Sequence, residues 1–132
     1  MNNKDLIAKA ASYVNSTKTE GGLLGDVACA LISKSGVIYV GVCASVGSNT
    51  FCAETNAIGS MISEAEFEIK KIVAVWKNEK DEVFVISPCG NCRQLMYEVH
   101  PNNLQTIVLL DRDKEISLKD LLPHYSSWKK QD

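Results

Sequence analysis

The chain has 132 residues, of which 45% are apolar and 23% charged, proportions that are ordinary for a soluble globular protein. Its 14 basic and 16 acidic residues give a formal net charge of −2, and the basic residues are scattered, which argues against long nucleic acid as a partner. Residues 1–10 lack the unbroken apolar core of a signal peptide, and no segment approaches a membrane span. We therefore expect a cytoplasmic protein without a membrane partner.

Five cysteines are present, at positions 29, 43, 52, 89 and 92. An odd number in a chain without an export signal argues against a disulfide framework. In a reducing compartment, closely spaced cysteines are more often metal ligands or catalytic groups, so their spacing matters.

In chain order, apolar residues at helical spacing predict an amphipathic helix over residues 4–15. Residues 16–25 are polar and then glycine-rich, which predicts a loop. Two strands follow at 27–33 and 37–43, and the turn residues between them, Lys34-Ser35-Gly36, suit a hairpin.

The small polar residues of 44–51 predict another loop, and a helix is expected from Cys52 to about Ser63. Residues 71–77 form an apolar run typical of a buried strand. Residues 83–87 lead to Pro88, which is well placed at or just before a helix start.

A second helical face runs from Gly90 to His100, and residues 105–110 predict the next buried strand. After the polar turn at 111–114, residues 117–122 suggest a short helix that Pro123 ends. This alternation predicts one mixed sheet with helices on its faces, in a three-layer α/β domain. Since no repeat, linker or low-complexity segment interrupts it, we expect a single domain over 1–132.

The residues that carry chemistry are Cys52, Glu54, Cys89 and Cys92, and each cysteine group begins a predicted helix. Cys89 and Cys92 are three positions apart, so both sulfurs can lie on one face of the first helical turn. Helix N-termini favour thiolate over thiol, and zinc binds thiolate. Three protein ligands leave a fourth tetrahedral position for water, as in catalytic zinc sites. Glu54 could sit beside that water and exchange protons with it.

Other readings of the cysteines remain open. The Cys-x-x-Cys pair alone could be a redox pair, although Pro88 stands where such pairs usually have an aromatic residue. Cys43 could supply a fourth ligand to a purely structural zinc site. Cys29 lies in an apolar strand and is expected to be a buried inert thiol. His100 and His124 adjoin prolines at element ends and are expected at the surface rather than at the metal.

The combined motif, Cys52-Ala53-Glu54 followed by 88–94 (Pro-Cys-Gly-Asn-Cys-Arg-Gln), resembles the three-cysteine form of the zinc nucleoside deaminases. Within that family the chain is similar to the small cytidine deaminases and the related blasticidin S deaminases. The likeness continues through Val40-Gly41-Val42 and through 120–123 (Asp-Leu-Leu-Pro), so it spans nearly the whole chain.

The resemblance implies a three-layer α/β/α cytidine deaminase-like fold with one mixed five-stranded sheet, and one Zn²⁺ per subunit. It implies a hydrolase that converts the cytosine amine of cytidine or deoxycytidine into the uracil form and releases ammonia. Glu54 would be the general acid/base. The backbone N–H of Ala53 would face the base carbonyl, and the carbonyl of Ser87 the leaving amine. The zinc ligands would be Cys52, Cys89 and Cys92. Family members are commonly homotetramers.

Several positions depart from the family pattern. Many cytidine deaminases have an arginine directly after the catalytic glutamate, where this chain has Thr55. Arg93 could offset the thiolate charge instead, or it could be an ordinary surface helix residue. Typical members bind the sugar with an Asn-x-Glu segment, and the matching segment here is Cys43-Ala44-Ser45. Cys43 and Ser45 are therefore the candidate substrate contacts.

These departures leave three functional hypotheses. The first is deamination of cytidine or deoxycytidine, and an alternative substrate is blasticidin S or another modified cytosine nucleoside. A hypothesis of a different class is a non-catalytic, zinc-stabilised binding protein. Glu54 argues against that class, because a structural zinc site needs no acid there.

Overall fold

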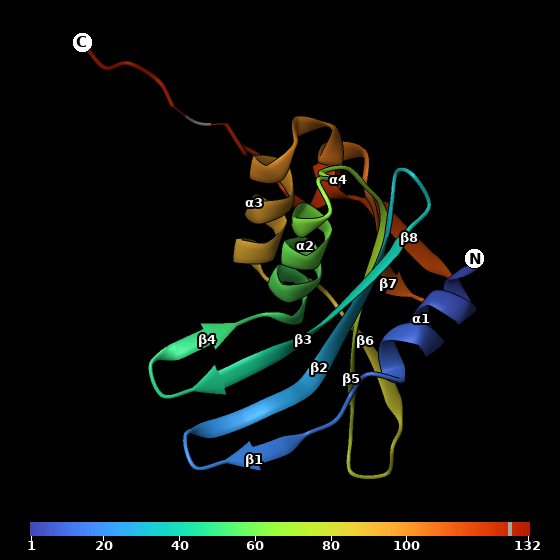
Figure 1. Ribbon diagram of the computed structural model, residues 1–132. Helices are drawn as coiled ribbons and strands as arrows, with labels where there is room; N and C mark the ends of the chain where they lie inside the picture. The colour runs from blue at the N-terminus through green and yellow to red at the C-terminus, as the bar shows by residue number, and fades with distance from the viewer. Residues whose placement is uncertain (127) are drawn as a thin grey trace.

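The structure, a computed structural model, describes residues 1–126 and 128–132. Within them no helix is both long and apolar enough to cross a lipid bilayer. The elements in chain order (Figure 1) are α1 (Asn3–Ala11), β1 (Thr17–Thr19), β2 (Gly22–Ser33), β3 (Ile38–Val46), β4 (Asn49–Phe51), α2 (Ala53–Ser63), β5 (Ile69–Lys77), β6 (Val83–Ile86), α3 (Gly90–Val99), the 3₁₀-helix η1 (Pro101–Gln105), β7 (Ile107–Asp111), β8 (Lys114–Ser117) and α4 (Leu118–Leu121).

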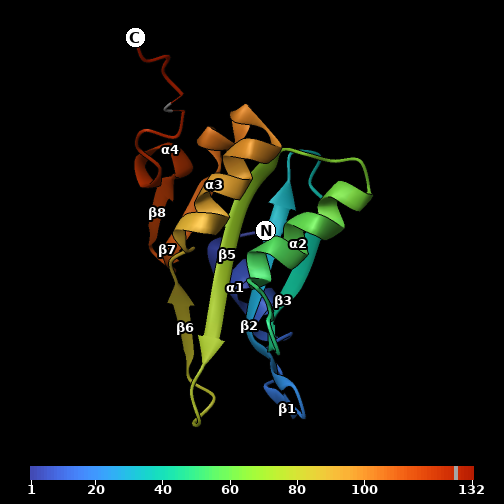
Figure 2. The ribbon, with the colours of Figure 1, turned by 90° about the vertical axis from the view of Figure 1, so that its left-hand side faces the viewer.

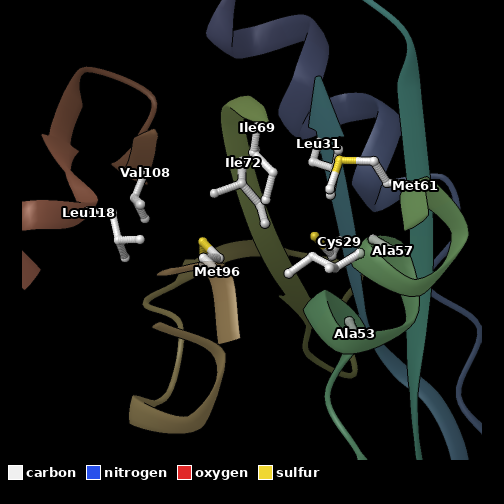
Figure 3. Packing of buried hydrophobic residues seen from close by; sticks show 11 residues of the cluster. Cys29, Leu31, Ala53, Ala57, Met61, Ile69, Ile72, Met96, Val108 and Leu118 are labelled. Carbon is white, nitrogen blue, oxygen red and sulfur yellow. The ribbon is translucent and has the colours of Figure 1, made fainter. Parts of the chain in front are cut away.

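Helices cover both faces of the sheet, with α2 and α3 on one face and α1 on the other (Figures 1 and 2). Each face has its own buried cluster. Ala57 and Met61 of α2 and Met96 of α3 pack with sheet residues on one side (Figure 3), while Leu6 and Ala10 of α1 pack on the opposite side. Burial of these apolar side chains is the main stabilising contribution to the fold. The predicted three-layer α/β/α class is confirmed.

The sheet has the strand order β4-β3-β2-β5-β7-β8, with β1 paired to β2 and β6 paired to β5. The β5–β7 pair is parallel, and the other pairs are antiparallel. The sheet is therefore mixed, as expected. The parallel pair requires a long crossover, and α3 and η1 provide it.

The number of strands is a correction, because the sheet has eight strands and not five. The loops expected at 16–25 and 44–51 contain β1 and β4, and the turn at 111–114 leads into β8. Every residue of β1 and β4 is exposed. These strands form by backbone pairing at hairpin ends rather than by burial, so they carry none of the apolar alternation from which strands are predicted.

The predicted helices are confirmed, with one shorter than expected. α1 ends at Ala11 rather than near residue 15. Beyond it, the N–H of Asn15 donates to the carbonyl of Gly25 at 2.9 Å, which directs the chain into the β1–β2 hairpin. α4 lies within the expected range 117–122, and Ser117 is its N-cap residue.

Gly41 lets α2 lie directly on β3. A Cβ atom at this position would come within 2.3 Å of the Ala57 nitrogen and 2.7 Å of the Ala53 oxygen, both backbone atoms of α2. The side-chain oxygen of Asn56 also accepts a hydrogen bond from the N–H of Val42 in β3, at 2.9 Å. These contacts fix the position of the N-terminal half of α2, where the candidate site lies.

Candidate metal centre

Three thiols meet where α2 and α3 begin. Cys52 is the N-cap residue of α2, Cys89 is the N-cap residue of α3, and Cys92 lies in the first turn of α3. The Sγ atom of Cys89 is 3.6 Å from that of Cys52 and 3.5 Å from that of Cys92. We call Cys52, Cys89 and Cys92 the three-cysteine cluster.

Among residues 1–126 and 128–132, the three-cysteine cluster is the one group of three or more metal-binding side chains whose ligand atoms all lie within 4.8 Å of one another. In a tetrahedral site with zinc–sulfur bonds of about 2.3 Å, the sulfur atoms are about 3.8 Å apart. The observed separations are close to that value. Three thiolates and an open fourth position also match the donor set of a catalytic zinc site. The residues present therefore fit Zn²⁺.

The electrostatics of the cluster favour binding of a cation. Burial raises the pKa of Cys52 and Cys92, and the nearby carboxylate of Glu54 raises both further. Burial also acts on Cys89, but the backbone N–H of Cys92, the two neighbouring thiols and the N–H of Asn91 outweigh it and lower the pKa of Cys89. The N–H groups and thiols around Cys89 thus favour its thiolate form, while burial opposes the thiolate form of Cys52 and Cys92. A divalent cation bound by the cluster would favour the thiolate form of all three.

Glu54 lies in the first turn of α2 and is only 5% exposed. Apolar side chains surround it on the side of the core, where Met96 and Val108 line a small gap together with it. Burial raises the pKa of Glu54 above its ordinary value. A buried carboxyl group with a raised pKa is well suited to accept and return protons near neutral pH.

A pocket of about 280 Å³ connects these groups. Its walls come from β2, β3, β4 and β6 and from the starts of α2 and α3. Its lining residues are Asp26, Val27, Cys43, Ala44, Ser45, Thr50, Phe51, Cys52, Ala53, Glu54, Ile86, Ser87 and Cys89. The residues proposed from the sequence to contact substrate (Ala53, Ser87, Cys43 and Ser45) therefore lie around one pocket with Glu54 and two members of the three-cysteine cluster.

Cys43 lies in that pocket but outside the three-cysteine cluster. Its Sγ atom donates a hydrogen bond to Oδ1 of Asp26 at 2.9 Å and accepts one from the N–H of Val27 at 3.3 Å. Burial and the hydrogen bond to Asp26 raise the pKa of Cys43. The thiol is therefore a neutral hydrogen-bonding group and not a fourth ligand. Cys29 is fully buried in the core, as expected.

Arg93 is a structural link rather than an exposed helix residue. Its guanidinium group donates to the carbonyl of Pro88 at 2.8 Å, to the carbonyl of Leu121 at 3.1 Å and to Oγ of Ser87 at 2.9 Å. It thus joins the loop before α3 to the end of α4. These bonds hold in place the backbone around Ser87 that lines the pocket.

The family model for the cytidine and deoxycytidylate deaminase zinc-binding region matches residues 1–108. The chain belongs to this deaminase family. A blasticidin-S deaminase from Bacillus cereus is 35% identical to it over 103 residues, which cover 74% of each protein.

Solved structures of cytidine deaminases share the deaminase fold of this chain. The enzyme from Burkholderia pseudomallei is 26% identical, with a TM-score of 0.75 over 94% of this chain and 98% of its own. The enzyme from Mycobacterium tuberculosis is 19% identical, with a TM-score of 0.76 over 97% of this chain and 99% of its own. The expected cytidine deaminase-like fold is confirmed.

Membership of a zinc-binding deaminase family makes zinc the cofactor of this chain, and the three-cysteine cluster can hold one ion. Of the two carboxylates that line the pocket, Glu54 is predicted from the sequence and Asp26 is not. It stands just after Gly25, at the boundary between an expected loop and an expected strand, where a lone carboxylate gives no pattern. The Asn-x-Glu segment of typical cytidine deaminases matches residues 43–45 of β3, whereas the carboxylate of Asp26 belongs to the neighbouring strand β2.

Proposed function

We propose that this protein is a hydrolase that deaminates a cytosine nucleoside, with the three-cysteine cluster as its zinc ligands and Glu54 as its general acid/base. The observation that carries the proposal is a buried glutamate that lines one pocket with Cys52 and Cys89. Neither a structural zinc site nor a redox thiol pair needs a buried carboxylate beside its sulfurs. A non-catalytic binding protein is therefore not favoured.

The reaction consumes one water molecule and releases one molecule of ammonia. When bound, zinc would supply the Lewis acidity that makes water a nucleophile near neutral pH. Glu54 takes a proton from the water that attacks the ring carbon bearing the amine, and passes it to the adjacent ring nitrogen. Glu54 then transfers the second proton of that water to the departing amine. Burial supports this shuttle, because it raises the carboxyl pKa toward the working pH.

The backbone around the pocket would orient the base. The N–H of Ala53, at the first position of α2, is free to donate to the base carbonyl, since the first N–H groups of a helix have no partner within it. The carbonyl of Ser87 would accept a hydrogen bond from the amine. Arg93 would keep that backbone in position through its bonds to Ser87 and Pro88.

Cytidine and deoxycytidine are the substrates we propose first. Blasticidin S is a second candidate, since the Bacillus cereus relative is a blasticidin-S deaminase and β3 lacks the Asn-x-Glu segment of typical cytidine deaminases. Release of ammonia should be measured with zinc-loaded protein on cytidine, deoxycytidine, cytosine, guanine and blasticidin S. We expect turnover of one or more of the three nucleosides and none of guanine. Zinc-loaded protein without activity on any cytosine compound would refute the proposal.

We further propose that residues 1–132 form one domain and that the protein works as a homotetramer in the cytoplasm. A single domain is supported by the family match to residues 1–108 and by the two buried clusters, each of which contains residues from both halves of the chain. The requirement for three reduced thiols supports a reducing compartment. The tetramer rests on the family resemblance, and light scattering coupled to gel filtration tests it: a monomeric mass for the active, zinc-loaded protein would contradict it.

A further inference from the structure

The pocket beside the three-cysteine cluster contains a second carboxylate that no step of the proposed reaction uses. Asp26 and Glu54 both line it, and none of the described lining residues is Lys, Arg or His. Zinc with three thiolates would add a net charge of −1 to the same pocket. Its electrostatic character is therefore acidic, and Asp26 is available to interact with a ligand.

Asp26 is held in place by an irregularity in the sheet. The β2–β3 register is interrupted between Leu24 and Ala28, so that residues 25–27 of β2 face only Cys43 of β3. Gly25, with φ +73°, begins this bulge, and a Cβ atom there would come within 2.7 Å of the Asn15 oxygen. Bulges of this kind are common beside active sites, because they redirect a side chain.

The bulge creates a short hydrogen-bond chain. The N–H of Val27 donates to the Cys43 thiol, which donates to Oδ1 of Asp26. A carboxylate has about four lone-pair sites and a thiol is a weak donor, so Asp26 retains most of its capacity to accept hydrogen bonds. A hydrogen-bond acceptor that is fixed on the wall of a pocket favours ligands that carry a hydrogen-bond donor at that position.

The chemistry of the base determines which part of a substrate faces Asp26. The amine must point to the three-cysteine cluster and Glu54, and the sugar-bearing ring nitrogen lies directly across the ring from the amine-bearing carbon. The sugar therefore points away from the starts of α2 and α3. Among the lining residues that belong to neither helix start, β2 and β3 supply the polar side chains of Asp26, Cys43 and Ser45.

We propose that Asp26 is a specificity-determining residue, whose carboxylate accepts a hydrogen bond from a sugar hydroxyl of the substrate and excludes substrates phosphorylated on the sugar. This inference rests on the proposed deamination of a nucleoside, and deepens it. The family's description names a nucleoside, cytidine, and a nucleotide, deoxycytidylate. Asp26 would favour the nucleoside, because the phosphate group of a nucleotide would enter an acidic pocket in which none of the described lining residues is a cation.

The test compares wild type with Asp26→Asn, both loaded with zinc, on cytidine, cytidine 5′-monophosphate, 5′-deoxycytidine and 2′,3′-dideoxycytidine. A hydrogen bond to a charged group is worth about a tenfold to hundredfold change in affinity. We expect Asp26→Asn to raise KM for cytidine by about that factor with little change in kcat. The increase should vanish for the analogue that lacks the contacted hydroxyl. The variant should also discriminate less against the monophosphate.

Asp81→Asn is the matched control, since Asp81 is an exposed aspartate in the β5–β6 turn, outside the pocket. Zinc content and thermal unfolding should be equal in wild type, control and variant. If Asp26→Asn does not fold, wild type alone still tests the proposal: it should prefer cytidine to its monophosphate and lose at least about tenfold in kcat/KM with one deoxy analogue.

Three outcomes would overturn the inference: an unchanged KM for cytidine in zinc-loaded Asp26→Asn, an equal loss on every analogue, or equal use of cytidine and its monophosphate by wild type. An equal loss would indicate a purely structural role. Failure of wild type on every nucleoside would instead refute the proposed function, so the two failures are distinguishable.

Discussion

Glu54 is a carboxylate in surroundings that oppose its charge, because burial removes it from water. A protein keeps such a group only where another contribution offsets the cost of burying it. Beside the three-cysteine cluster, a bound zinc ion would supply that contribution. The same burial raises the pKa of Glu54, which is consistent with the proposed proton transfer.

Replacing Glu54 with glutamine should abolish the proton shuttle and leave the zinc ligands intact. We expect Glu54→Gln to retain its zinc, as measured by plasma mass spectrometry, and to lose about 10³-fold or more in kcat. Glu64→Gln is the control, because Glu64 is exposed at the other end of α2. Zinc-loaded Glu54→Gln with near wild-type turnover would refute the mechanism.

Cys89 offers a separate test of the metal site. Because a zinc ion bound by the three-cysteine cluster would hold the two helix starts together, Cys89→Ala should lower zinc content and the midpoint of thermal unfolding in parallel. Cys29→Ala is the control, since this thiol is buried in the core: it should lower stability through lost packing and leave zinc content unchanged. Undiminished zinc in Cys89→Ala would exclude Cys89 as a ligand.

Among single residues, the sequence predicts the site residues that belong to a motif. It does not predict those whose role depends on which residue of another strand they face. The spacing of Cys52 to Glu54 and of Cys89 to Cys92 is local, and helix geometry places each pair at the start of one helix. That the two helix starts meet is indicated only by the combined motif. The environment of Cys43 depends on which residue faces it across β2–β3, and a bulge there brings Asp26 to it. No local pattern encodes that pairing.

At the scale of elements, the contact between α2 and β3 determines where the site lies. The absence of a side chain at Gly41 allows the helix backbone to approach the strand closely. The helices themselves follow from apolar periodicity, and so do the buried strands. The exposed strands β1 and β4 do not, because their pairing depends on the hairpins to which they belong.

Gly41→Ala should therefore displace α2, since the new methyl group would collide with two backbone atoms that cannot move independently. We expect a loss of about 1–3 kcal/mol or more in the free energy of unfolding, measured by urea denaturation, together with reduced activity. Gly59→Ala is the matched control on the same helix. Nothing lies within 4 Å of its added Cβ, and alanine favours helix by about 1 kcal/mol, so this variant should be more stable. Equal stability of the two variants would contradict the close approach.

At the scale of the whole molecule, carboxylates join segments that are distant in sequence. Glu66 accepts hydrogen bonds from the hydroxyls of Ser35 and Tyr39, and these bonds lower its pKa. The same bond to Glu66 is the main reason that the pKa of Tyr39 rises to about 12. This contact joins the α2–β5 loop to the β2–β3 hairpin.

The contribution of this contact to the stability of the fold should decrease at both acidic and alkaline pH. The folded pKa of Glu66 is lowered, so its contribution is present above the ordinary value of 4.5 and is lost as the pH falls through the folded pKa. The folded pKa of Tyr39 is raised, so its contribution is present below the ordinary value of 10.0 and is lost as the pH rises toward about 12. Glu66→Gln should therefore lower the thermal midpoint most between these limits.

The measurement is thermal unfolding of wild type and Glu66→Gln from pH 3 to pH 9. The difference between their midpoints should shrink at the acidic end, and Glu64→Gln should show no such trend because Glu64 is exposed. A difference that stays constant over the whole range would mean that the charge of Glu66 contributes nothing.

The distance along the chain between the thiols also constrains how the protein folds. Cys52 and Cys89 are 37 residues apart in sequence, and the paired strands β5 and β6 lie between them in the chain. Contacts between distant positions form late, because the intervening chain must first be ordered. We therefore expect zinc to bind to a chain that is already largely folded. Zinc uptake during refolding would then measure how quickly the centre of the sheet is completed.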